Sequence, residues 1–444
     1  MPMTSPRKLP AARFSDGLPN PARLWAFLAI AIALTMAVLD SAIVNVALPV
    51  LAQQLQVDPA TAVWAVNAYQ LAITVSLLPL ASLGDAVGYQ RIYWAGLLVF
   101  TVASLGCALA GSFPLLIPAR ILQGLGAAGI MSVNIALVRF IYPAKLLGRG
   151  MGSTALVVAV SSAAGPTLAA AILSVASWPW LFLINVPLGV FALIVAARTL
   201  PETPQSARRL DGLSVLLNAL TFGLLITGID ALGSGDLTYP LPALAGAVVV
   251  GFVFVRYQLS LPMPLLPLDL LQRPVFALSM LTSVCSFATQ SLAYLALPFY
   301  FHDELGRSVA ETGMLMTPWP LAIAVAAPVS GRLADRFSPG LLGGIGLATL
   351  AGGLALLAML PNDPSTADIV WRLTVCGLGF GLFQSPNNKA IITSAPPERS
   401  GGASGMQSLV LLRNNGEHSY SPGGSPCPRH ALRKSFRMRR YGLL

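Results

Sequence analysis

Long apolar stretches alternate with short polar loops along most of the chain. Most of these stretches approach or exceed the roughly 20 residues that a helix needs to cross a bilayer. The pattern therefore predicts an all-α integral membrane protein with about twelve transmembrane helices. The stretches fall at residues 24–48, 61–83, 92–111, 115–138, 152–175, 180–199, 213–232, 241–255, 275–301, 312–330, 341–360 and 369–392.

The composition agrees with this prediction. Of the 444 residues, 55% are hydrophobic and only 10% are charged, against roughly 25% charged in soluble domains. A soluble enzyme, a secreted module and a nucleic-acid-binding protein are all incompatible with that balance. The sequence has no Walker loop, no metal-ligand cluster and no Gly-x-Ser-x-Gly motif, so we expect neither an enzyme nor a bound cofactor or metal ion.

The basic residues indicate the orientation of the chain. Most of the 27 Lys and Arg residues lie in alternate loops or in the C-terminal tail. Because cytoplasmic loops are enriched in Lys and Arg, this distribution predicts a cytoplasmic N-terminus, and twelve spans return the C-terminus to the same side. The first span is too long for a signal-peptide core, so we interpret it as an uncleaved helix. We expect a multi-pass protein of a bacterial-type inner membrane that contacts lipid and binds no nucleic acid.

One carboxylate interrupts the first apolar stretch. Asp40 lies most of the way along residues 24–48. An ionisable side chain at membrane depth costs at least about 2.5–3.5 kcal/mol, and such residues most often mark an ion or proton pathway. The alternative is a structural carboxylate that neighbouring helices satisfy.

Two parts of the chain carry the same landmarks. The second span closes on Leu83–Gly88 and the tenth on Gly331–Arg336, and each is followed by an arginine before a Gly-Leu-Gly sequence. Asp85 and Arg120 are 35 positions apart, and Asp335 and Arg372 are 37 apart. This spacing predicts two parallel structural repeats with a pathway between them. We expect an N-terminal six-helix lobe at 1–200, a linker with two inserted helices at 201–272 and a C-terminal lobe at 273–407.

These landmarks resemble the major facilitator superfamily and, within it, the fourteen-helix drug:proton antiporters. The most specific match is Leu39–Pro49, which is similar to the first-helix signature of that subfamily. The resemblance implies two pseudo-symmetric lobes and proton-coupled export of amphipathic or cationic small molecules by alternating access, by a protein that acts as a monomer. A dedicated exporter of one metabolite and a non-transporting truncated remnant are the alternatives.

The loop motif G-x-L-a-D-r-x-G-r-k of the superfamily occurs twice. The first copy retains Asp85 and Gly88, followed by Arg91, but has Ala81, Tyr89 and Gln90 where the motif has glycine and basic residues. The second copy retains Asp335 and Arg336. The resemblance implies that these residues form a latch, since a carboxylate at a helix end pairs with arginines and helix dipoles and separates as the lobes rock. The alternative is a solvated turn.

Two further segments resemble family motifs. Arg120 begins a sequence similar to the fourth-helix motif in which a buried arginine takes part in proton coupling. A nearby arginine lowers the proton affinity of a carboxylate whereas burial raises it, so Asp40 and Arg120 are the expected proton switch; the alternative for Arg120 is snorkelling toward the interface. Gly165 and Pro166 resemble the antiporter signature G-P-x-x-G-G, with both final glycines replaced by alanine.

Polar side chains inside the spans are candidates for the substrate cavity. Each of them could instead form a hydrogen bond between helices. The candidates are Asn67, Gln70, Asn134, Gln290, Gln384 and Asn387.

The sequence changes character after Gln407. The family continues into a thirteenth and a fourteenth span, but here the apolar run ends at Leu412 and a Ser/Pro/Gly-rich, Arg-rich segment follows. We interpret residues 408–444 as a basic non-membrane tail that is out of frame, with the last two helices missing. The alternative is an evolved basic tail that binds anionic lipid.

Overall fold

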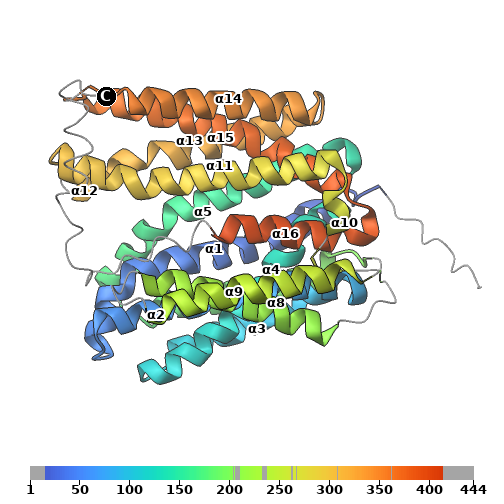
Figure 1. Cartoon of the computed structure of the whole chain (residues 1–444), viewed down its shortest axis with the longest axis horizontal. Coiled ribbons are helices and arrows are strands. Elements are labelled where there is room, and N and C mark those ends of the chain that lie inside the picture. Colours follow the sequence, from blue (N-terminus) through green and yellow to red (C-terminus); the bar gives the residue numbers. More distant parts are fainter. Residues whose placement is uncertain are drawn as a thin grey trace, which may run out of the picture.

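The structure, a computed structural model, describes residues 16–203, 205, 211–232, 238–261, 264–266, 268–307, 309–361 and 363–413. Its described regular elements are all helices, which run roughly parallel to one another (Figure 1). They form twelve segments that are long and apolar enough to cross a membrane, and two of these segments consist of two consecutive α-helices. The predicted all-α fold with twelve spans is therefore confirmed, and the protein is a multi-pass membrane protein.

The first half of the chain forms six spans. The predicted run 180–199 is one span made of two helices, because the chain breaks at Ile184. Pro187 has no N–H for the carbonyl of Leu183, which is where the first of these helices ends. The elements are α1 (Ala22–Gln54), α2 (Pro59–Val87), α3 (Tyr89–Ala108), α4 (Phe113–Ile141), η1 (Ala144–Leu146), α5 (Leu147–Val175), α6 (Trp180–Leu183) and α7 (Asn185–Thr199).

Local signals set the ends of α2. Asp58 caps its N-terminus, where the carboxylate accepts the Thr61 N–H at 3.1 Å, and Pro59 occupies a first-turn position that needs no N–H. Gly88 ends α2 with φ +101°, a conformation that favours glycine. The sharp turn there lets α3 start at the next residue.

The second half continues with further helices and one π-helical segment. The elements are α8 (Gly212–Ala231), α9 (Pro240–Leu259), α10 (Leu268–Leu271), α11 (Pro274–Phe299), the π-helix η3 (Tyr300–Glu304), α12 (Val309–Met316), α13 (Pro318–Ala334), α14 (Pro339–Ala358), α15 (Thr366–Ser394), η4 (Pro397–Arg399) and α16 (Ser400–Arg413).

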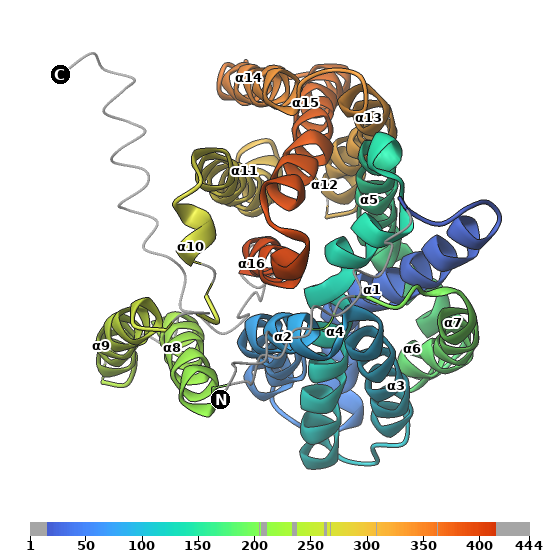
Figure 2. The same cartoon turned by 90° about the vertical axis from the view of Figure 1, so that its right-hand side faces the viewer.

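The predicted inserted helices α8 and α9 pack against each other at the periphery of the bundle and touch α2 (Figure 2). Pro79 lies inside α2 and has no N–H, so the carbonyl of Val75 loses its intrahelical partner. Asn218 of α8 donates its Nδ2–H to that carbonyl at 2.7 Å and is fully buried. The hairpin is thus hydrogen-bonded to α2 where the proline interrupts the helix.

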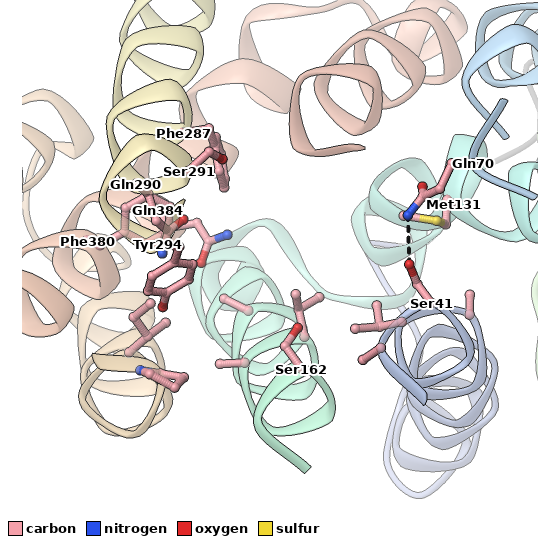
Figure 3. A pocket seen from close by; sticks show the side chains of 18 of the residues that line it. Ser41, Gln70, Met131, Ser162, Phe287, Gln290, Ser291, Tyr294, Phe380 and Gln384 are labelled. Carbon is pink, nitrogen blue, oxygen red and sulfur yellow. Dashed lines mark hydrogen bonds between the residues drawn. The ribbon is translucent and has the colours of Figure 1, made fainter. Parts of the chain in front are cut away.

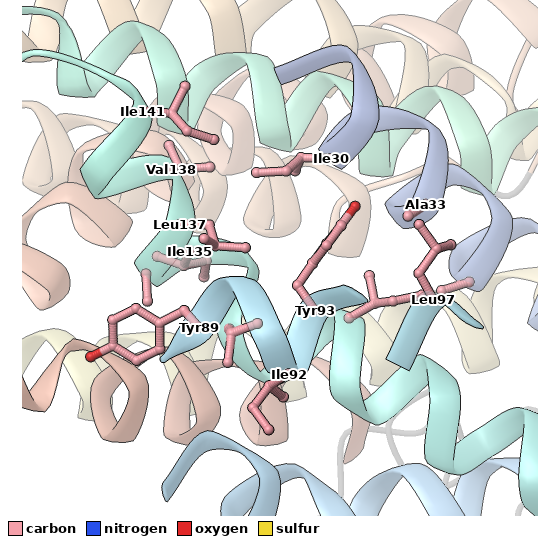
Figure 4. Packing of buried hydrophobic residues seen from close by; sticks show 14 of the residues in the cluster. Ile30, Ala33, Tyr89, Ile92, Tyr93, Leu97, Ile135, Leu137, Val138 and Ile141 are labelled. Carbon is pink, nitrogen blue, oxygen red and sulfur yellow. The ribbon is translucent and has the colours of Figure 1, made fainter. Parts of the chain in front are cut away.

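The largest core cluster lies mainly within the first six spans and extends to buried residues of α10, α11, α15 and α16. Tyr93 points from α3 toward α1, between Ile30 and Ala33, in Figure 4. Its hydroxyl donates to the carbonyl of Ala29 at 3.0 Å. This bond satisfies the polar end of an otherwise apolar side chain.

The two halves of the bundle meet at the end from which Figure 2 is viewed. We call this the basic end; Asp85, Arg139, Lys145, Asp335, Lys389 and Arg399 lie there. There α5 packs along α13, and α16 packs along α2 and α4. A Cβ at Gly152 would lie 2.6 Å from the Ala327 carbonyl oxygen, so the α5 and α13 backbones approach too closely for a larger residue.

Most of the tail predicted for 408–444 lies outside the described residues, which end with α16 at Arg413. The truncation, the shifted frame and the lobe boundaries at 200, 272 and 407 stay predictions.

Candidate functional site

A buried ion pair joins α1 and α4. Asp40 is 2% exposed and Arg120 is 0% exposed, and Arg120 Nη1 donates to Asp40 Oδ2. Arg120 Nε donates to the Ala65 carbonyl of α2 at 2.7 Å. The two residues expected from the sequence to form a proton switch are therefore in direct contact. Arg120 points into the protein, so the snorkelling alternative is wrong.

The sequence reasoning missed a third member of this site. Gln123 accepts from Arg120 Nη1 at 2.6 Å and donates to Asp40 Oδ1 at 2.8 Å and to Ser104 Oγ at 2.9 Å. Asn185 also donates to Asp40 Oδ1, at 3.4 Å. The available signal was spacing, because residues three apart share a helix face and Gln123 follows Arg120 by three positions.

A cavity of about 270 Å³ lies between the two halves of the bundle. Side chains of α1, α2, α4 and α5 face it from one side, and those of α11, α13 and α15 face it from the other (Figure 3). Three glutamines, two from the second half, line it with aromatic rings: Gln70, Gln290 and Gln384 with Tyr69, Phe287, Tyr294 and Phe380. The described residues that line the cavity include no charged side chain.

Three of the six predicted cavity residues are therefore on its wall. Asn67, Asn134 and Asn387 are not among the lining residues. Asn387 instead donates to Ser283 Oγ of α11 at 2.7 Å, which is the bond between helices that the alternative anticipated. Asn134 is 4% exposed within α4.

Two cavity residues also touch the ion-pair region. Tyr69 is among the residues that line the cavity although it is 0% exposed, and Arg120 Cζ stands 4.3 Å from its ring centroid. Gln70 donates to Ser41 Oγ at 2.7 Å, the bond drawn in Figure 3, and Ser41 follows Asp40 in the chain. One layer of side chains thus separates the cavity from the ion pair.

At the basic end, Asp85 reaches across to α16. Its Oδ1 accepts the Gly401 N–H at 2.9 Å, at the N-terminus of that helix, where the helix dipole favours a carboxylate. The Tyr89 hydroxyl donates to the same oxygen at 2.8 Å. The superfamily motif has a basic residue at the position of Tyr89. Here Tyr89 provides a hydrogen bond to Asp85 in place of a contact with a charged group.

Asp335 makes the reciprocal contact with α5. It accepts the Gly148 N–H at 2.7 Å and the Arg149 N–H at 3.2 Å, again at a helix N-terminus. Lys389 Nζ lies 3.0 Å from Asp335 Oδ1. The two motif carboxylates are therefore in equivalent positions, each facing a helix of the other half.

The other predicted latch residues are placed differently. Gly88 forms the turn between α2 and α3, whereas Arg91 and Arg336 are exposed. A basic side chain outside the motif, Arg139, does cross between the halves and donates to the Ile392 and Ala395 carbonyls at 3.0 and 2.9 Å. The sequence marks Arg139 only as one of many basic residues near the loops.

The antiporter-like segment lies where α5 meets α1. Gly165 is buried, and a Cβ there would collide with Ala42 of α1, a cavity-lining residue. Pro166 follows it inside α5. Close backbone contact requires glycine at position 165. No group of three or more His, Cys, Asp or Glu side chains that could hold a metal occurs in the part of the chain that the structure describes.

Comparison with known proteins gives consistent matches. The family model described as Major Facilitator Superfamily matches residues 30–411. The uncharacterized transporter YebQ of Escherichia coli (strain K12) is 58% identical over 401 residues, which cover 90% of this chain and 88% of YebQ. The tetracenomycin C resistance and export protein of Streptomyces glaucescens is 30% identical over 396 residues, or 88% of this chain and 73% of that protein. The human organic anion transporter MFSD10 has the same fold, with a TM-score of 0.63 at 17% identity, covering 90% of this chain and 92% of that one.

Proposed function

The chain belongs to the Major Facilitator Superfamily, and from this premise we propose that it is a proton-coupled antiporter that exports amphipathic or cationic small molecules across a bacterial inner membrane. The observation that carries the proposal is the buried Asp40–Arg120 pair one side-chain layer from a cavity between the two halves of the bundle. Burying an ionisable pair costs free energy, and the position of this pair beside the pathway allows proton binding to be coupled to substrate export.

The proposed cycle starts from the arrangement described above. With the basic end closed by the Asp85 and Asp335 contacts, the cavity exchanges its contents with the opposite side. A proton that reaches Asp40 neutralises it and weakens its attraction to Arg120, which favours the opposite state. Reopening at the basic end would separate both carboxylates from the helix N-termini that they face.

The cavity wall suggests the kind of molecule carried. Aromatic faces offer apolar contact and attract delocalised cations, and the three glutamines offer both hydrogen-bond donors and acceptors. An amphipathic aromatic compound fits this lining better than a small, strongly hydrated ion. The name of the Streptomyces glaucescens relative adds support for export. We further propose that the chain acts as a monomer and belongs to the fourteen-helix drug:proton antiporters.

Transport in everted membrane vesicles tests this function. We expect an imposed pH gradient to drive uptake of ethidium, a planar aromatic cation, into vesicles that contain the full chain. Asp40→Asn should abolish gradient-driven uptake while ethidium binding to the purified protein stays measurable, because the variant retains the size of the side chain and loses its titration.

The same vesicles separate the alternatives. A dedicated exporter would transport one member of a panel of ethidium, riboflavin and tetracenomycin C, whereas a multidrug exporter would transport several. A non-transporting remnant would transport none of the three compounds under the same pH gradient. Uptake by Asp40→Asn at the wild-type rate would remove Asp40 from the mechanism.

A further inference from the structure

We propose that the Tyr69 ring transmits the occupancy of the cavity to the Asp40–Arg120 pair, so that substrate and proton binding exclude each other without competing for one carboxylate. This inference rests on the proposed function, since it concerns how that antiport is coupled. It assigns to Tyr69 a positioning role that acts through Arg120.

Substrate and proton cannot compete directly for one charged group among the described lining residues of this cavity. The described lining residues include no carboxylate and no basic group, and Asp40 lies behind them at 2% exposure. A substrate in the cavity therefore acts on the ion pair through an intervening side chain. Tyr69 is the described lining residue whose ring contacts Arg120.

The contacts of Tyr69 suit this role. Its ring faces Arg120 at 4.3 Å, while Phe182 faces the same guanidinium from 5.5 Å. The hydroxyl donates to the Ala37 carbonyl of α1 at 3.0 Å, one turn before Asp40. A Cβ at Gly124 would lie 2.6 Å from the Tyr69 carbonyl oxygen, so α2 packs on α4 too closely there for a larger residue than glycine.

The coupling follows because substrate and proton each favour a different position of the Tyr69 ring. A substrate packed against Tyr69 holds the ring over Arg120, and Arg120 stays paired with ionised Asp40. A proton on Asp40 removes the charge that holds Arg120, and displacement of the guanidinium lets the ring turn into the space that the substrate needs. Each ligand thus favours one ring position, which is the differential interaction that linkage requires.

Other titratable groups face the Asp40–Arg120 pair. Cys107 of α3 approaches it through a 3.4 Å contact to Gln123 Oε1, and Tyr69 is itself titratable. Cys107 is fully buried and is not among the lining residues, so it has no contact with a bound substrate.

Tyr93 provides a matched control. Like Tyr69, it is 0% exposed and donates its hydroxyl to an α1 carbonyl at 3.0 Å, but it contacts neither Arg120 nor the cavity among the described residues. Tyr69→Leu and Tyr93→Leu therefore remove comparable packing and one comparable hydrogen bond. Tyr69→Phe keeps the ring over Arg120 and removes only the hydroxyl.

The experiment measures ethidium binding by fluorescence to the purified full chain at pH 6 and pH 8. In the wild type we expect the dissociation constant to be larger at pH 6, by a factor in the range of about 5–150 that site-to-site coupling usually gives. This ratio should stay near its wild-type value in Tyr93→Leu and Tyr69→Phe and fall to about one in Tyr69→Leu. If Tyr69→Leu does not accumulate, Tyr69→Met fills the space without a ring and should give the same ratio of about one.

Three results would each contradict either the proposed function or the role of Tyr69. A wild-type protein that does not bind ethidium, or binds it independently of pH, contradicts the proposed function. A pH-dependent wild type together with an equally pH-dependent Tyr69→Leu overturns the role of Tyr69. Loss of the dependence in Tyr69→Phe as well would also overturn it, because the hydroxyl and not the ring would then carry the effect.

Discussion

Replacing Asp335 by asparagine tests whether the charge at the end of α13 holds the two halves of the bundle together. The substitution preserves size and one acceptor oxygen and removes the negative charge. Two contacts cross to α5, from the Gly148 N–H at 2.7 Å and the Arg149 N–H at 3.2 Å. The Lys389 contact lies within the second half and is present whether or not the halves separate.

The magnitude follows from those two crossing bonds, which end on different oxygens of Asp335. A hydrogen bond to a charged group contributes about 1.5–3 kcal/mol and a neutral one about 0.5–1.5 kcal/mol, so the bond that asparagine keeps weakens by about 1–1.5 kcal/mol and the other is lost at a cost of about 1.5–3 kcal/mol. The two changes together give about 2.5–4.5 kcal/mol, or roughly 70–2000-fold in the equilibrium between closed and open basic ends. The Arg149 guanidinium adds little, because it is half exposed and 3.9 Å away.

Distance measurements between spin labels can follow this equilibrium. Lys145→Cys and Leu341→Cys place labels at exposed positions on opposite halves of the basic end, in a background in which the four native cysteines are replaced. We expect Asp335→Asn to shift the distribution toward longer distances. Asp368→Asn is the control, because its ion pair with Arg372 lies within α15. Identical distributions for wild type and Asp335→Asn would refute the reasoning.

The α8–α9 hairpin and the orientation give two further predictions. Asn218→Leu removes the bond to the Val75 carbonyl and should cost about 0.6–1.7 kcal/mol, the range for hydrogen bonds between membrane helices, seen as a lower thermal unfolding midpoint in detergent. An unchanged midpoint would mean that the hairpin does not brace α2. Reporter fusions after Asp58 should report the outer side and fusions after Lys145 the cytoplasm; an inner-side signal after Asp58 would reverse the orientation.

The spans could be predicted because length and hydropathy determine them. Each predicted run overlaps a helix, but the ends differ where polar residues continue the helix, as at Gln54 of α1. The break at Ile184 follows from the missing N–H of Pro187, and hydropathy alone does not reveal it. Likewise, the bond between Asn218 and Val75 depends on two helices 143 positions apart and has no local signal.

Only part of the site could be predicted, and the reason is helix rotation. Asp40 and Arg120 were recognised because charge inside an apolar run is conspicuous in any sequence. Gln123 is an ordinary helix residue whose importance depends on which way its helix faces, and a sequence with weak amphipathic periodicity does not specify this. The exposed positions of Arg91 and Arg336 have the same cause, because a motif fixes spacing along the chain but not the facing partner.

The surroundings of Arg120 explain why an aromatic ring suits the coupling role. Breaking a buried ion pair by removing one partner's charge typically costs about 3–5 kcal/mol, because the other charge is left without compensation. When Asp40 takes a proton and the Tyr69 ring turns, Arg120 retains the Ala65 carbonyl, the Gln123 amide and the face of the Phe182 ring. Cation–π attraction in a desolvated site reaches about 2 kcal/mol or more, which offsets part of that cost. Phe182 therefore stabilises the unpaired guanidinium, and Tyr69 is the ring whose position a substrate in the cavity can change.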